Sequence, residues 1–135
     1  MIEREILQTL QKATTAAVAQ SSMVGLPIKF TGITFVVPND QKYLEVVHIP
    51  NNADRQYYGD EKQYQGLFRI ILHWPIDAQG VYPAMNLIAS IAGYFSKNRW
   101  FDKVKISEVP NLTGVLEKPP EVLLPVSIRY VAFEA

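Results

Sequence analysis

Apolar side chains recur at helical spacing in two stretches of the chain. The first runs from Ile2 to Gln20 and the second from Val81 to Lys97. Apolar residues three and four positions apart share one face of a helix, so each stretch predicts a helix that buries one side. The stripe residues are Ile2, Ile6, Leu10, Ala13 and Ala17 in the first stretch, and Val81, Met85, Ile88, Ile91, Ala92 and Phe95 in the second.

Apolar and polar residues alternate in other stretches, which is the pattern of β-strands. The clearest strand is predicted at Tyr64–Trp74, and Tyr43–Ile49 shows the same pattern up to Pro50, which is expected to end it. A long final strand is predicted at Val122–Phe133. Shorter extended segments are predicted at residues 28–37, 104–106 and 115–118, with turns at 77–80 and 111–114.

The final predicted strand is apolar on both of its faces. One face carries Leu124, Val126, Ile128 and Tyr130, and the other carries Leu123, Val131 and Phe133. Such a strand is buried on both sides or contributes one side to an interface.

Helices and strands are mixed along the chain without strict alternation. The order is one helix, two or three strands, a second helix and three more strands. It predicts an α+β fold with a mainly antiparallel or mixed sheet, on which the N-terminal helix and the central amphipathic helix pack. The sequence shows no internal repeat and no boundary, so residues 1–135 are expected to form a single domain.

The longest segment without a regular pattern is Asn51–Gln63, which is mainly polar and carries Tyr57 and Tyr58. Loops of this length in compact domains often have a function. Together with Tyr64, the two tyrosines form a cluster of a residue type common at protein interfaces. Packing of the loop onto the sheet is an equally good explanation of the tyrosines.

Charge and composition restrict the possible functions. The 13 Lys and Arg residues balance the 13 Asp and Glu residues, and the pI is near 6.7, so the chain lacks the basic excess of a nucleic-acid-binding protein. The absence of cysteine excludes disulfides, thiolate metal sites and cysteine nucleophiles. The N-terminal residues lack the pattern of a signal peptide, and no apolar run approaches the length of a membrane span, so we expect a soluble intracellular protein.

No motif for catalysis, cofactor binding or metal binding is present. The glycines are isolated, which excludes the common dinucleotide and phosphate-binding loops, and no Gly-x-Ser-x-Gly elbow occurs. His48 and His73 lie in predicted strands without a third ligand nearby, which favours packed or half-exposed histidines. The loop acids Asp54, Asp60 and Glu61 do not have the spacing of a calcium loop.

Four cations lie at and just after the C-terminal end of the second predicted helix, namely Lys97, Arg99, Lys103 and Lys105. Cations stabilise the C-terminal end of a helix, and Trp100 with Phe101 would anchor that end in the core. The alternative is a contact with nucleic acid or a partner, in which the two rings would stack on bases. The helix end with a buried anchor is the favoured interpretation.

A series of landmarks then links these elements. After the opening helix comes the strand Tyr43-Leu44-Glu45-Val46, which ends at Ile49-Pro50-Asn51. A polar loop then precedes the strand that begins Tyr64-Gln65-Gly66-Leu67-Phe68-Arg69-Ile70. The turn Asp77-Ala78-Gln79-Gly80 leads into the amphipathic helix. This order resembles the tail terminator and tail-completion (head–tail joining) proteins of long-tailed bacteriophages. The resemblance covers nearly the whole chain and is most specific from Tyr64 to Gly80.

The resemblance implies a small α+β subunit that assembles into a ring, typically a hexamer, at the head-proximal end of the virion tail. Assembly would take place in the host cytoplasm. The ring would cap the tail tube, stop its polymerisation and offer a docking surface to the head connector, while DNA passes through the lumen without specific binding. The implied partners are further copies of the chain, the tail tube protein and the head-connector protein, with no membrane, cofactor, metal or catalytic residue.

Within this resemblance, Asp54, Arg55, Tyr57 and Tyr58 are the predicted contact between the ring and its stacked neighbour. A long polar loop with tyrosines can become ordered on a partner. The competing function is a small α+β ligand-binding domain or enzyme, with a pocket between the second helix and the sheet. His48, His73 and Trp74 would line that pocket. A head-completion or baseplate component is a further structural alternative.

Overall fold

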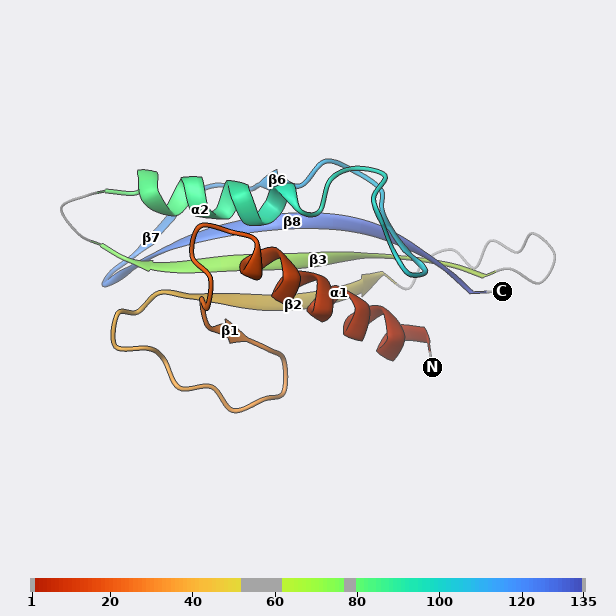
Figure 1. The fold of residues 1–135 in the computed structure, drawn as a ribbon, viewed down its shortest axis with the longest axis horizontal. Helices are drawn as coiled ribbons and strands as arrows, with labels where there is room; N and C mark the ends of the chain where they lie inside the picture. Colours follow the sequence, from red (N-terminus) through yellow and green to blue (C-terminus); the bar gives the residue numbers. More distant parts are fainter. Residues whose placement is uncertain (1, 52–61, 77–79, 135) are drawn as a thin grey trace.

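The computed structural model describes residues 2–51, 62–76 and 80–134. Within these residues the chain forms two helices and one mixed sheet of eight strands (Figure 1). The elements are α1 (Ile2–Ala19), β1 (Ile28–Lys29), β2 (Tyr43–Asn51), β3 (Lys62–Pro75), α2 (Tyr82–Gly93), β4 (Trp100–Phe101), β5 (Val104–Ile106), β6 (Asn111–Leu112), β7 (Leu116–Lys118) and β8 (Glu121–Glu134). The predicted α+β class is confirmed.

The sheet is organised around β3 and β8. Its order is β1-β2-β3-β8-β5-β4, and β6 and β7 also pair with β8. The strands β3 and β8 run antiparallel along their whole length, from Lys62 opposite Glu134 to Pro75 opposite Glu121. The short strand β1 runs parallel to β2, which makes the sheet mixed, and the other pairs are antiparallel.

The core lies between the helices and one face of the long strands. Alternate side chains of β2, β3 and β8 point to this face, and the buried stripes of α1 and α2 join them in one cluster. Fully buried members are Leu10, Leu44, Phe68, Ile70, Leu72, Ile91, Phe95, Leu124 and Ile128. The periodic patterns therefore identified most of the core-facing residues. In α2, however, the buried Ala84 and Leu87 lie outside the predicted stripe, and Val81, Met85 and Ala92 of that stripe are only partly buried.

Several boundaries differ from the prediction. The strand β2 continues through Pro50 to Asn51, because β1 pairs only with Leu44 and Glu45 and leaves the outer edge of β2 open at the proline. A proline without an N–H is tolerated at such an edge. The extended segment predicted at 28–37 is a strand only at Ile28–Lys29, and α2 ends at Gly93, before the predicted Lys97.

The residues predicted to form a turn at 111–114 instead begin with a short strand. Asn111 pairs with Ser127 and Leu112 with Val126, and the Thr113 N–H donates to the carbonyl of Pro125 at 3.1 Å. A strand of two residues shows no periodicity of its own, and β8 determines its conformation by pairing with it.

A glycine near the start of β3 makes room for a buried tyrosine. Gly66 lies opposite Tyr130 of β8, and a Cβ built on Gly66 would overlap the Tyr130 ring. Tyr130 is almost completely buried, and its hydroxyl contacts Nε2 of His48 on β2. The tyrosine therefore connects the two strands on either side of β3, and it can do so because residue 66 has no side chain.

The substitution Gly66→Ala is expected to destabilise the fold by about 1–3 kcal/mol, the usual cost of adding volume to a packed core. The new methyl group would displace Tyr130 from its contact with His48. The measurement is the free energy of unfolding from urea titration. Gly93→Ala is the matched control, since a Cβ there meets no neighbouring atom; equal stability of the native protein and Gly66→Ala would contradict the packing argument.

Candidate functional site

The predicted contact residues Asp54, Arg55, Tyr57 and Tyr58 lie outside the described residues. They belong to segment 52–61, which joins the end of β2 to the start of β3. The described residues at these two strand ends show the surface to which that segment is attached.

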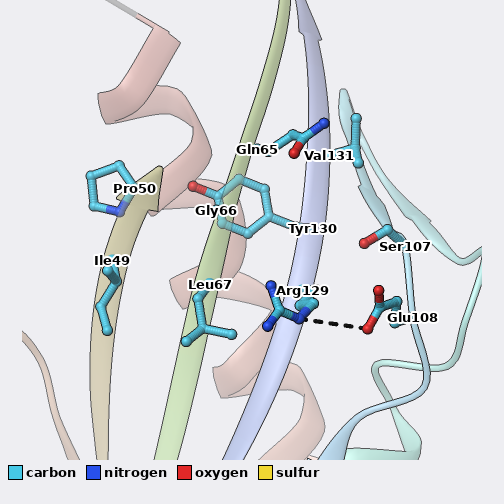
Figure 2. A pocket seen from close by; sticks show the side chains of 10 residues that line it. All are labelled: Ile49, Pro50, Gln65, Gly66, Leu67, Ser107, Glu108, Arg129, Tyr130 and Val131. Carbon is cyan, nitrogen blue, oxygen red and sulfur yellow. Dashed lines mark ion pairs between the residues drawn. The ribbon is translucent and has the colours of Figure 1, made fainter. Parts of the chain in front are cut away.

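A cavity of about 410 Å³ lies at this end of the sheet. Figure 2 shows it on the face of the sheet that is turned away from α1, which lies behind the strands in this view. The lining residues are Ile49 and Pro50 of β2, Gln65, Gly66 and Leu67 of β3, Arg129, Tyr130 and Val131 of β8, and Ser107 and Glu108 after β5.

The chemistry of this cavity suits contact with another surface. Its charged groups are Arg129 and Glu108, which form an exposed ion pair with 3.5 Å between Nε and Oε2 (Figure 2). Ile49 and Leu67 add apolar side chains, and Ile49 is exposed. The lining holds neither a histidine nor a pair of carboxylates, so it offers no evident acid–base pair.

The two histidines lie on opposite faces of the sheet. His48 is paired with Phe68 and points with it towards the helices, whereas His73 is paired with Tyr43 on the other face. The two imidazoles therefore belong to separate sites. No group of three metal-ligating side chains is found among the residues that the structure describes.

His73 is held between two carboxylates. Its Nε2 lies 2.8 Å from Oε1 of Glu45, and its Nδ1 lies 3.1 Å from Oε2 of Glu121. The ring also stacks on Tyr43, with the ring centres 4.2 Å apart. Burial raises the pKa of Tyr43, and the neighbouring charges of Glu121 and Glu45 raise it further. This cluster connects β2, β3 and the start of β8. The side chains of His73, Glu45 and Glu121 all take part in these contacts.

An apolar groove of about 350 Å³ lies between α2 and the sheet. The sequence-based alternative placed a pocket here, but its proposed lining was wrong, because His48, His73 and Trp74 are elsewhere. The groove is lined by Met85, Ile88, Ala89, Ala92 and Gly93 of α2, by Val109, Pro110 and Leu112, and by Val126 of β8. It contains no acid or base for catalysis.

Trp100 and Phe101 were predicted to form a buried anchor after the second helix, and this prediction is wrong for Trp100. Trp100 is 53% exposed, and Phe101 is half-buried, because both residues form the edge strand β4 and do not continue the helix. The guanidinium of Arg99 lies over the Tyr94 ring at 4.0 Å, and its Nη1 donates to the Tyr94 carbonyl. Lys105 lies over Trp100 at 5.8 Å. The cations are thus partly engaged by aromatic rings of the chain itself.

Comparisons with known proteins identify a family. A family model described as "Phage tail terminator protein" matches residues 5–130. No curated protein matches the chain. Several solved structures match the chain, and one of them aligns with 93% of this chain and 94% of its own, with a TM-score of 0.72 and 21% sequence identity, which shows a shared fold. Among the described residues, no helix combines the length and apolar character needed to span a membrane.

A pH dependence is expected from His48. Burial lowers the pKa of His48 below its ordinary value of about 6.5, so the folded protein favours the neutral ring. As the pH falls below about 6.5, the unfolded chain takes up this proton before the folded one, and the stability that neutral His48 contributes is lost.

The variant His48→Gln retains a polar side chain but does not titrate. Between about pH 7 and about pH 5, the free energy of unfolding should therefore fall more steeply for the native protein than for His48→Gln. Urea titrations at each pH give both curves. Parallel curves would show that His48 does not cause this pH dependence.

Proposed function

The chain belongs to the phage tail terminator family, and we propose that six copies of it form a closed ring. The proposed ring caps the tail tube and stops its polymerisation. The family is structural and non-enzymatic, and its members are phage tail proteins of the virion that interact with other tail or head components. The match over residues 5–130 is the observation that carries the proposal.

The proposed ring lies at the head-proximal end of the tail and offers a docking surface to the head connector. DNA passes through its lumen without specific binding. The formal net charge of zero supports this, because a protein that holds DNA through its phosphates usually carries a basic excess. Each ring subunit is a single domain of residues 1–135, and assembly takes place in the host cytoplasm.

The sheet supports assembly of identical copies because its two edges differ. One edge is formed by β1 and β2, and the opposite side of the sheet is formed by β4 to β7, which are all short strands. Unpaired strand edges and exposed apolar residues favour association. When two different surfaces of one chain meet between copies, the contact is head-to-tail, and it closes into a ring if the rotation allows.

The contact with the stacked neighbour is proposed at Asp54, Arg55, Tyr57 and Tyr58. These residues belong to the segment that joins β2 to β3, and described residues near the adjoining ends of those two strands line the cavity of Figure 2. Tyrosine and arginine are enriched among residues that dominate binding energies at interfaces. The segment and the cavity would together face the tail tube or the connector.

The enzyme or ligand-binding alternative gains little from the geometry. A groove does lie between α2 and the sheet, but its lining is apolar, and the two histidines lie away from it on opposite faces of the sheet.

The ring is tested by native mass spectrometry of the purified protein. We expect an assembly of six copies of the 15.3 kDa chain, alone or after mixing with tail tube protein. A protein that remains a single chain under both conditions would refute the ring.

Replacing Asp54, Arg55, Tyr57 and Tyr58 together with alanine is expected to leave the ring intact and abolish capping. The loss follows from removing the side chains that bind the stacked neighbour, while the net charge stays unchanged. Capping is measured as the length distribution of tail tubes in electron micrographs. The matched control replaces Glu117 and Lys118, an exposed acid and base on β7 at the other end of β8. Tubes of native length with the loop variant would refute the assignment.

A further inference from the structure

Residues 30–42, referred to here as the β1–β2 loop, project from the edge of the sheet (Figure 1). Three of the aliphatic side chains in this loop point into solvent: Ile33 is 64% exposed, Val36 84% and Val37 52%. Apolar residues that gather on one exposed segment mark a site of interaction with another surface.

The loop is held in shape from its base. The Phe35 ring packs against Tyr43, with their centres 5.1 Å apart, and Tyr43 in turn stacks on the buried His73. Within the loop, the Gln41 N–H donates to the carbonyl of Pro38 at 2.9 Å. A loop that is already ordered loses less conformational entropy when it binds, so the exposed aliphatic residues are arranged for docking.

The apolar groove between α2 and β6 lies towards the opposite edge of the sheet from the β1–β2 loop. The β1–β2 loop is attached to β1 and β2, whereas the groove is formed by α2 with β6 and β8, beyond β3 in the order of the strands. Figure 1 shows the loop and α2 with β6 at opposite borders of the molecule. The chain thus has an apolar projection on one side and an apolar hollow on the other.

The apolar part of the loop and the lining of the groove are both without charged side chains. Ile33, Val36 and Val37 lie within residues 30–38, which contain no charged side chain, and the nine residues that line the groove contain none either. The charged residues of the loop, Asp40 and Lys42, come after this part of it. Docking would therefore bury apolar groups without removing any charge of either surface from water, which is the costly step at many interfaces. Because the whole chain has a formal net charge of zero, copies do not repel one another at a distance.

We propose that the β1–β2 loop of one copy inserts Ile33, Val36 and Val37 into the groove between α2 and β6 of the next copy. This inference rests on the proposed ring and identifies the contact that closes it. Since loop and groove are different surfaces of the same chain, each copy offers one and receives the other, and the contact repeats head-to-tail around the ring.

The contact is tested by placing one charge on each surface. Val36→Asp puts a carboxylate on the loop, and Ala89→Asp puts one on the exposed wall of the groove. Each variant alone is expected to lose the ring and to run as a single chain in native mass spectrometry. Val24→Asp is the matched control, since Val24 is 72% exposed but lies outside both surfaces, and it should retain the ring. Circular dichroism verifies that all three variants fold.

A mixture of the two variants provides the decisive measurement. The Val36→Asp copy retains a native groove and the Ala89→Asp copy a native loop, so together they can form one contact. The expected species is a pair containing one of each variant, with about twice the mass of a single chain and nothing larger.

If the native protein forms a ring and both variants still form it, the loop-and-groove contact is overturned, but the proposed ring is not. Loss of the ring in both variants without a pair in the mixture would likewise overturn the contact. A native protein that never forms a ring would instead refute the proposed function, and this contact with it.

Discussion

The pairing of β3 with β8 supports most of the other elements of the fold. The two strands are hydrogen-bonded in antiparallel register from Lys62–Glu134 to Pro75–Glu121. On the other side of β8, the short strands β5, β6 and β7 pair in turn along its length. A strand of two or three residues is not stable alone, so each of these depends on β8 for its hydrogen-bond partners. The helices then cover the face where alternate residues of the long strands are apolar.

This arrangement also determines which surfaces are left for contact. Because β8 has neighbours on both sides, its edges are used inside the molecule, and the open edges are those of β2 and of the short strands. The β1–β2 loop is attached at one of these borders and the groove beside β6 at the other. Two unlike borders on one subunit are the geometry that the proposed ring of identical copies requires.

The polar residues in the sheet have mainly structural partners. His73 joins Glu45 and Glu121, and it supports the Tyr43 ring against which the β1–β2 loop packs. His48 contacts Tyr130 across the space left open by Gly66. The preference for packed or half-exposed histidines over catalytic ones agrees with these contacts. The sequence did not reveal the partners, because they are separated from the histidines by 28 to 82 residues.

The periodicity of the sequence predicted the two helices, the three long strands and most of the residues that face the core, because burial of one face imposes a period of 3.6 or 2 on the chain. It missed the buried Ala84 and Leu87 of α2. The sequence also supported the family through the order of its landmarks. Three features depend on contacts between distant segments. Asn111 and Leu112 form a strand, Trp100 is exposed, and Met85, Leu112 and Val126 line one groove. A local pattern indicates that a side chain is buried. Which distant segment buries it, or whether it stays exposed, is determined by how the whole chain packs.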